Sequence, residues 1–261
     1  MKALLEFDGK IFYDDDLKAS FLKLGVSKGD TLCVHTELFS FGKALMPKNE
    51  FLQSLLECFW DILGEDATLL MPTFSYSFCK NEVYDKLNSR STMGVLTEYF
   101  RKQKGVWRSN DPIFSFAVAG FRQKAFMKDY ESCFGKGCVY DTLTKQNGKI
   151  MFFGTLKLGC TFTHFTEETA GVSYRYFKEF SGKMIDENGK TSQKSIKYFV
   201  RALDRPSAVS VKKQQEIFEK TGNFKCLKFA GAPIALVDSK KYLANNLKAF
   251  KINENVMLRD L

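Results

Sequence analysis

The chain holds only two histidines, and one of them, His164, has the neighbours that acid–base chemistry needs. It lies in a threonine-rich run from Gly159 to Glu168, with Glu167 three residues after it. A neutral imidazole is the side chain best suited to accept a proton near pH 7. If the segment is helical, the Glu167 carboxylate lies on the same face as the imidazole. The spacing predicts a general base with a carboxylate partner; the alternative is a surface helix start capped by threonine.

Polar side chains also follow several predicted strands. The strand that ends at His35 is followed by Thr36 and Glu37, and Met71-Pro72-Thr73-Phe74-Ser75 repeats this pattern. Open α/β sheets bind ligands in the crevice at the carboxyl ends of their strands. Each group alone is more typical of turn or capping residues, and it is the repetition that favours one such crevice. For His35 itself we favour a structural role, holding the loop from Thr36 to Gly42.

Composition excludes several classes of function. The formal charge is +9, but basic residues are spread along the chain without a block, which argues against nucleic acid. The seven cysteines form no CxxC pair, so we expect reduced thiols in a cytoplasmic protein and no metal site. No apolar run approaches the ~20 residues of a membrane span, and the N-terminus is not a signal peptide. Nucleophile-elbow, Walker and dinucleotide-binding motifs are missing.

Periodicity predicts alternating helices and strands in one domain over residues 1–261. We expect helices at 14–25, 49–63, 93–102, 211–221 and 239–249. We expect strands at 31–35, 68–71, 113–120, 149–154, 174–180, 183–186, 196–200 and 232–237. This order predicts a layered α/β/α fold with a β-rich insertion near 173–204.

The ordered motifs resemble the aminoglycoside 3-N-acetyltransferase family over most of the chain. The matching segments are Leu24-Gly25-Val26, Gly29-Asp30, Val34-His35-Thr36, Met71-Pro72-Thr73-Phe74-Ser75, Gly94 to Arg101, Arg108-Ser109-Asn110-Asp111-Pro112, Ser115-Phe116-Ala117-Val118-Ala119-Gly120 and Thr161-Phe162-Thr163-His164-Phe165-Thr166-Glu167. The resemblance implies that family's fold, with a mixed central sheet, and transfer of acetyl from acetyl-CoA to a primary amine of an amino sugar.

The resemblance also implies roles for individual residues. His164 would accept the amine proton, and Glu167 would orient the ring or hold the amine. Backbone N–H groups of a strand-end loop would stabilise the oxyanion. Acetyl-CoA would contact His35, Thr36, Ser40, Gly42, Thr73, Ser75, Arg108, Ser109, Ser115 and Phe116. The amino sugar would contact Glu37, Phe74, Asp111, Thr161 and Glu168.

Departures from the family pattern bear on the substrate. Glu37 replaces a hydroxyl, Asp111 replaces a histidine, and the later β-rich part carries Tyr198-Phe199-Val200-Arg201 near a family glutamate. Few carboxylates and many aromatic rings suit an anionic acceptor, so we hypothesise a nucleotide-linked amino sugar of bacterial glycan assembly. One alternative is acetylation of aminoglycoside antibiotics, and another is a non-catalytic CoA- or nucleotide-binding protein. The expected partners are small molecules, and the Phe-rich strands leave room for a homodimer interface that the sequence does not locate.

Overall fold

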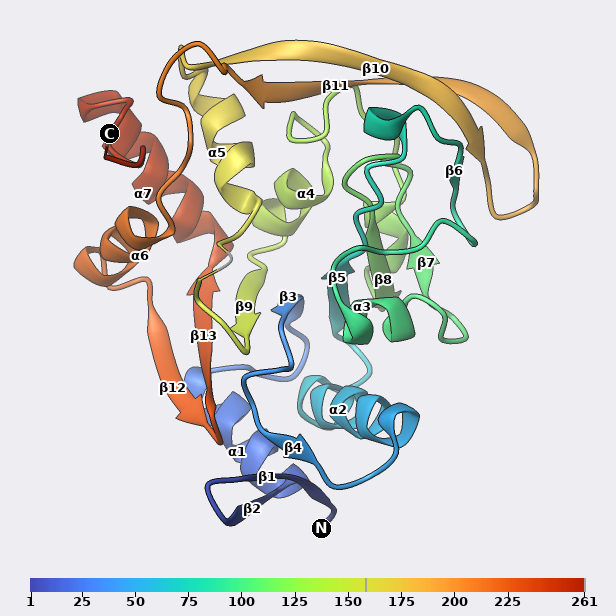
Figure 1. The fold of residues 1–261 in the computed structure, drawn as a ribbon, viewed down its shortest axis with the longest axis vertical. Coiled ribbons are helices and arrows are strands. Elements are labelled where there is room, and N and C mark those ends of the chain that lie inside the picture. Colours follow the sequence, from blue (N-terminus) through green and yellow to red (C-terminus); the bar gives the residue numbers. More distant parts are fainter. Residues whose placement is uncertain (158, 261) are drawn as a thin grey trace.

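A seven-stranded mixed sheet forms the centre of the computed structural model, which describes residues 1–157 and 159–260 (Figure 1). Its strand order is β12-β13-β9-β3-β5-β8-β7. β3 (Thr31–Thr36) pairs in parallel with both β5 (Thr68–Pro72) and β9 (Lys149–Phe153), so these three strands end at one edge. The outer strands pair antiparallel: β7 (Trp107–Arg108), β8 (Phe116–Gly120), β12 (Lys225–Phe229) and β13 (Ala232–Asp238). The prediction of a mixed central sheet is confirmed.

Successive strand residues point to opposite sides of this sheet, so both of its faces carry apolar side chains. Helices cover both faces. Leu32 and Val34 of β3 join one core, while Cys33 between them joins the other. The first core is covered by α1 (Asp14–Leu24), α2 (Lys48–Leu63) and α3 (Val95–Phe100). The second core is covered by α4 (Val139–Lys145), α5 (Phe162–Ala170), α6 (Val211–Lys220) and α7 (Ser239–Ile252). The layered α/β/α prediction is therefore confirmed.

A long hairpin crosses over one end of the molecule, at the top of Figure 1. It pairs β10 (Arg175–Ile185) with β11 (Thr191–Arg201), and the short β6 (Tyr84–Asp85) adds in parallel to β10. The β-rich insertion near 173–204 is thus present. The two short strands expected at 174–180 and 183–186 are one continuous strand, because the register with β11 runs unbroken past Gly182.

The N-terminus carries a small sheet that the sequence analysis did not predict. It consists of β1 (Ala3–Phe7), β2 (Lys10–Tyr13) and β4 (Lys43–Ala44). Asp8 and Gly9 form the turn, with φ values of 52° and 71°. An Asp-Gly pair that adopts positive φ at both positions is a strong hairpin signal.

Some element boundaries also differ from the prediction. β8 begins at Phe116 rather than at residue 113, because Asp111 Oδ1 accepts hydrogen bonds from the backbone N–H groups of Ile113 and Phe114, each 2.8 Å long. The chain there forms a side-chain-closed turn instead of ladder pairs. Two short 3-10 helices, η1 (Phe78–Lys80) and η2 (Gln123–Phe126), complete the described elements. None of the helices in the described ranges has the length and apolar character needed to span a membrane.

Candidate active site

His164 is held from behind by a buried carboxylate and a buried guanidinium. Residues 162–170 are helical, so Glu167 lies one turn after His164, and His164 Nδ1 is 2.6 Å from Glu167 Oε2. The Glu167 side chain is 0% exposed, whereas that of His164 is 24% exposed. Two lone pairs cannot share a 2.6 Å contact, so we assign the intervening proton to Nδ1. That tautomer leaves the Nε2 lone pair free to accept a proton.

Arg175, the first residue of β10, completes this centre and was missed by the sequence analysis. Its Nε lies 2.8 Å from Glu167 Oε2 in an ion pair, although the N–H is not aligned for a hydrogen bond. Its Nη2 is 3.0 Å from His164 Nδ1, a contact that is not a hydrogen bond in this tautomer because both nitrogens are donors, and Nη1 donates to the Phe199 carbonyl over 3.0 Å. Burial alone would raise the pKa of Glu167, but the partners His164 and Arg175 lower it. The carboxylate therefore stays ionised behind the imidazole.

His35 has a different environment at the end of β3. Its Nε2 is 3.1 Å from the Cys160 thiol and 3.3 Å from the Tyr140 hydroxyl, and Tyr140 bonds to Thr161 Oγ1 over 2.6 Å. Burial lowers the pKa of His35 to about 4. A neutral imidazole held by neutral partners fits the structural role favoured for this residue.

A cleft of about 660 Å³ opens in front of His164; we call it the His164 cleft. Its walls come from three regions: the start of α5, one face of the hairpin, and the segments before α6 and after α7. The side chains that line it include Thr161, His164, Arg175, Tyr176, Lys178, Phe180, Tyr198, Arg201 and Arg259. Among the described residues no Asp or Glu lines this cleft.

A second cleft, of about 880 Å³, lies beside α3; we call it the Ser75 cleft. Its cations are Lys48, Lys80, Arg90 and Lys102, and its acids are Glu82 and Glu98. Glu98 is already bound to Arg101 and Lys102; burial opposes its ionisation, but these hydrogen bonds lower its pKa to about 2. The free charge of the Ser75 cleft is therefore positive.

A narrow slot of about 90 Å³ at the ends of β3 and β9 lies between the two clefts. It is lined by His35, Thr36, Met93, Phe152, Thr155, Gly159 and Thr161. Gly159 and Thr161 also line the His164 cleft, while Met93 precedes Gly94 of the Ser75 cleft. Two elongated ligands entering from opposite sides would meet at this slot.

The predicted cofactor-binding residues divide into three groups. His35 and Thr36 line the slot, and Ser75 lines the Ser75 cleft. Ser40 is exposed and donates to Glu37, and Gly42 packs so tightly on β1 that an added Cβ would lie 2.4 Å from the Glu6 carbonyl oxygen. Ser40 and Gly42 therefore shape the loop and line none of these three spaces.

The third group is buried and bonded internally. Arg108 Nε donates to Thr73 Oγ1 and Ser115 Oγ over 3.2 and 3.0 Å, and its Nη1 donates to the Ser89 carbonyl. Ser109 Oγ accepts from the Phe116 N–H. These groups satisfy one another and hold the segment at Ser89 that borders the Ser75 cleft. The buried side chains that do not line that cleft are Thr73, Arg108, Ser109, Ser115 and Phe116.

Of the predicted substrate-binding residues, only Thr161 lines the His164 cleft. Asp111 and Phe74 are fully buried, and Glu37 accepts hydrogen bonds from Phe39 and Ser40 within its own loop. Glu168 accepts from Ser132 over 2.8 Å and lines a separate cleft beside β11. Lys178, Tyr198, Arg201 and Arg259 line it instead, and the period-two alternation along the hairpin was an available signal for Lys178 and Tyr198.

No group of His, Cys, Asp and Glu able to hold a metal occurs in the described part of the chain. Four of the seven cysteines are buried, Cys160 is half-buried, and Cys79 and Cys226 are exposed.

Comparison with known proteins supports the resemblance read from the motifs. The family model described as aminoglycoside 3-N-acetyltransferase matches residues 33–251. A curated relative, the SPbeta prophage-derived aminoglycoside N(3')-acetyltransferase-like protein YokD of Bacillus subtilis (strain 168), is 29% identical over 145 residues, 47% of this chain. The chain spans about half the length, 50%, of this curated relative.

Solved structures share the fold at low identity. A structure of AAC-IIIb with CoASH has a TM-score of 0.78 at 21% identity, covering 92% of this chain and 97% of that one. A structure of AAC(3)-IVa in complex with gentamicin has a TM-score of 0.79 at 21% identity, covering 95% and 92%. The family match extends over most of the sequence, and the chain therefore belongs to the aminoglycoside 3-N-acetyltransferase family.

Proposed function

We propose that this protein transfers acetyl from acetyl-CoA to a primary amine of an amino sugar, with His164 as the general base. The single observation that carries this proposal is the His164–Glu167–Arg175 centre, which leaves an imidazole nitrogen free at the wall of a cleft. Family membership and the CoASH complex of AAC-IIIb support acetyl-CoA as the donor.

The Ser75 cleft suits the donor. Its unpaired cations complement the phosphate groups of CoA, and it leads toward the slot at Thr36. We propose that the thioester arm of acetyl-CoA lies along walls formed by Ser75, Thr36 and the backbone at Gly94. Acetyl-CoA, when bound, supplies the activated acyl carbon.

The His164 centre supplies the acid–base chemistry. An ammonium ion is not a nucleophile, so the acceptor must react as the neutral amine, whose nitrogen loses one proton as the new C–N bond forms and the C–S bond of the thioester breaks. His164 Nε2 takes that proton, while Glu167 holds the ring through Nδ1 and stabilises the imidazolium that forms. The same proton can then pass to the departing sulfur of CoA, which restores the neutral imidazole.

Two acceptor classes fit different observations. A nucleotide-linked amino sugar of bacterial glycan assembly is favoured by the acid-free, cationic lining of the His164 cleft. An aminoglycoside is favoured by the family and by the gentamicin complex of AAC(3)-IVa. We give priority to the first, because a polycation in this cleft would meet like charges without carboxylates to balance them.

Thiol release from acetyl-CoA, scanned over nucleotide-linked amino sugars and aminoglycosides, tests the proposal. We expect release of CoA thiol together with an N-acetylated sugar. If no amino sugar of either class releases thiol from protein that binds CoA, the assignment as an N-acetyltransferase is wrong and the non-catalytic binding protein becomes the better account.

A further inference from the structure

Three cations that line the His164 cleft have no carboxylate partner among the described residues. Lys178, Arg201 and Arg259 are all exposed, and they form none of the ion pairs found in those residues. Asp204, near Arg201, pairs with Arg205, and Asp260, next to Arg259, pairs with Lys213. Glu179, next to Lys178, is opposite Lys197 in the hairpin register and does not line the His164 cleft. Three free positive charges around one concave surface create a potential that attracts anions.

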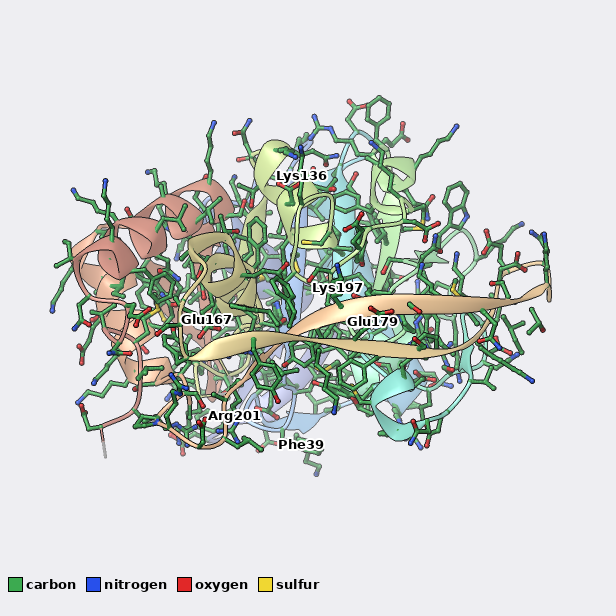
Figure 2. The ribbon with its side chains drawn as sticks, turned by 90° about the horizontal axis from the view of Figure 1, so that it is seen from above. Phe39, Lys136, Glu167, Glu179, Lys197 and Arg201 are labelled. Carbon is green, nitrogen blue, oxygen red and sulfur yellow. The ribbon has the colours of Figure 1, made fainter. Side chains whose placement is uncertain are left out.

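One face of the hairpin carries Lys178 into the His164 cleft, and Arg201 joins that cleft from the end of the hairpin. In the register of β10 and β11, Tyr176 is opposite Val200 and Lys178 is opposite Tyr198, and all four line the His164 cleft. The intervening Phe177 and Lys197 line the separate cleft that contains Glu168. Figure 2 shows Lys197 and Lys136 on one side of the hairpin and Arg201 on the other.

The cations are held by local contacts rather than by acids. Lys178 Nζ lies 5.0 Å from the centre of the Phe180 ring. Arg259 Nε donates to the Val209 carbonyl over 3.3 Å, so the C-terminal segment brings its guanidinium to the cleft. Arg201 is opposite Arg175 at the end of the hairpin, next to the centre that holds His164.

Aromatic surface accompanies the charge. Tyr176, Phe180 and Tyr198 line the same cleft, and Tyr176 is 54% exposed. Exposed aromatic rings beside cations suit a ligand that combines a flat base with phosphate groups, because rings stack on bases and guanidinium groups bind phosphate through paired hydrogen bonds.

We propose that Lys178, Arg201 and Arg259 form an anion subsite that binds the diphosphate of the acceptor while its amine lies at His164. This rests on the proposed function for the position of the amine, but the subsite makes its own prediction about binding. The diphosphate could instead belong to CoA, so the experiment must separate these two sources.

The direct test is calorimetric titration with UDP and with inorganic pyrophosphate, without any acceptor amine. The double variant Arg201→Gln/Arg259→Gln should bind UDP at least tenfold more weakly than the wild type, since each charge-assisted hydrogen bond contributes roughly a factor of ten or more. Lys183→Gln, at an exposed lysine of the same hairpin outside the cleft, is the control for loss of a nearby positive charge and should stay within about twofold. Equal UDP affinity in the double variant and the wild type, with both folded by circular dichroism, would overturn the subsite.

Titration at saturating CoA separates the two sources. UDP should still bind, since the donor is assigned to the Ser75 cleft. If CoA displaces UDP, these cations serve the donor and the subsite for an acceptor is wrong. UDP binding without thiol release on any amino sugar would leave the subsite intact and refute the proposed reaction. Thiol release on an aminoglycoside by protein that does not bind UDP would support the acetyl transfer and refute the subsite.

Discussion

His35 lines the narrow slot, and His164 lines the adjoining cleft that shares Gly159 and Thr161 with it, yet the surroundings of the two rings differ. His35 contacts a hydroxyl and a thiol, and burial lowers its pKa to about 4. His164 contacts an ionised carboxylate on one nitrogen and presents the other to a cleft. The comparison teaches that the partner of the imidazole, rather than proximity to the sheet edge, distinguishes the proposed base from a packing residue.

Replacing the two histidines in parallel gives the largest expected difference. His164→Gln should lower kcat by about 10²–10⁴-fold, the usual contribution of a positioned general base. His35→Gln should lower it far less, because its ring is not assigned to proton transfer. Steady-state thiol release from acetyl-CoA measures both. Equal losses in the two variants would remove the distinction between the two centres.

The buried ion pair behind His164 should matter for stability as well as for activity. Glu167→Gln leaves the Arg175 charge buried without its partner, which should lower the free energy of unfolding by about 3–5 kcal/mol. The double variant Glu167→Gln/Arg175→Met should recover much of this loss in urea denaturation, yet remain poorly active. Recovery of activity along with stability would mean that Glu167 acts on the fold alone.

The pH dependence of the free energy of unfolding tests the burial of His35. Its pKa is about 4 when folded and about 6.5 when unfolded, so the unfolded chain binds more protons in this interval. The free energy of unfolding should therefore fall as the pH drops from about 6.5 to about 4, by roughly 3 kcal/mol in total. Glu167, whose pKa is lowered in the folded chain, adds a loss only below about pH 4.

Urea denaturation across this pH range should show the loss for the wild type and a flatter profile for His35→Gln. An unchanged profile in the variant would show that another group titrates in this window. His164→Gln is the control that separates the two rings.

The smallest expected effect is at Tyr140. Tyr140→Phe removes the hydroxyl that joins His35 to Thr161, which should cost about 1 kcal/mol of stability and change kcat by less than about threefold. Thermal unfolding and thiol release measure the two quantities. A large loss of kcat with unchanged stability would give the His35 centre a catalytic part.

The histidine centre shows what local sequence can predict. Glu167 is three positions after His164, and this spacing on one helix is enough to bring them together. The Asp8-Gly9 pair is an equally local signal for the N-terminal hairpin. The alternation of strands and helices predicted the layered α/β/α fold, because the spacing of apolar residues indicates which face of each element is buried.

The cleft depends on contacts that no local pattern contains. Arg259 reaches the His164 cleft from the C-terminal segment, and Arg175 reaches Glu167 only because the hairpin folds over α5 (Figure 1). Thr73, Arg108 and Ser115 looked like a ligand-binding edge, but polar residues at strand ends can bond to one another as readily as to a ligand. Which occurs depends on long-range packing.

The most direct test of the central claim is the ratio of kcat/KM for a nucleotide-linked amino sugar to that for an aminoglycoside, measured as thiol release with the wild-type protein. The cationic, acid-free lining of the His164 cleft predicts a ratio well above one, which falls when Arg201 and Arg259 are replaced by glutamine. A ratio well below one, unchanged in that variant, would contradict the account and return the protein to the acceptor class of its named relatives.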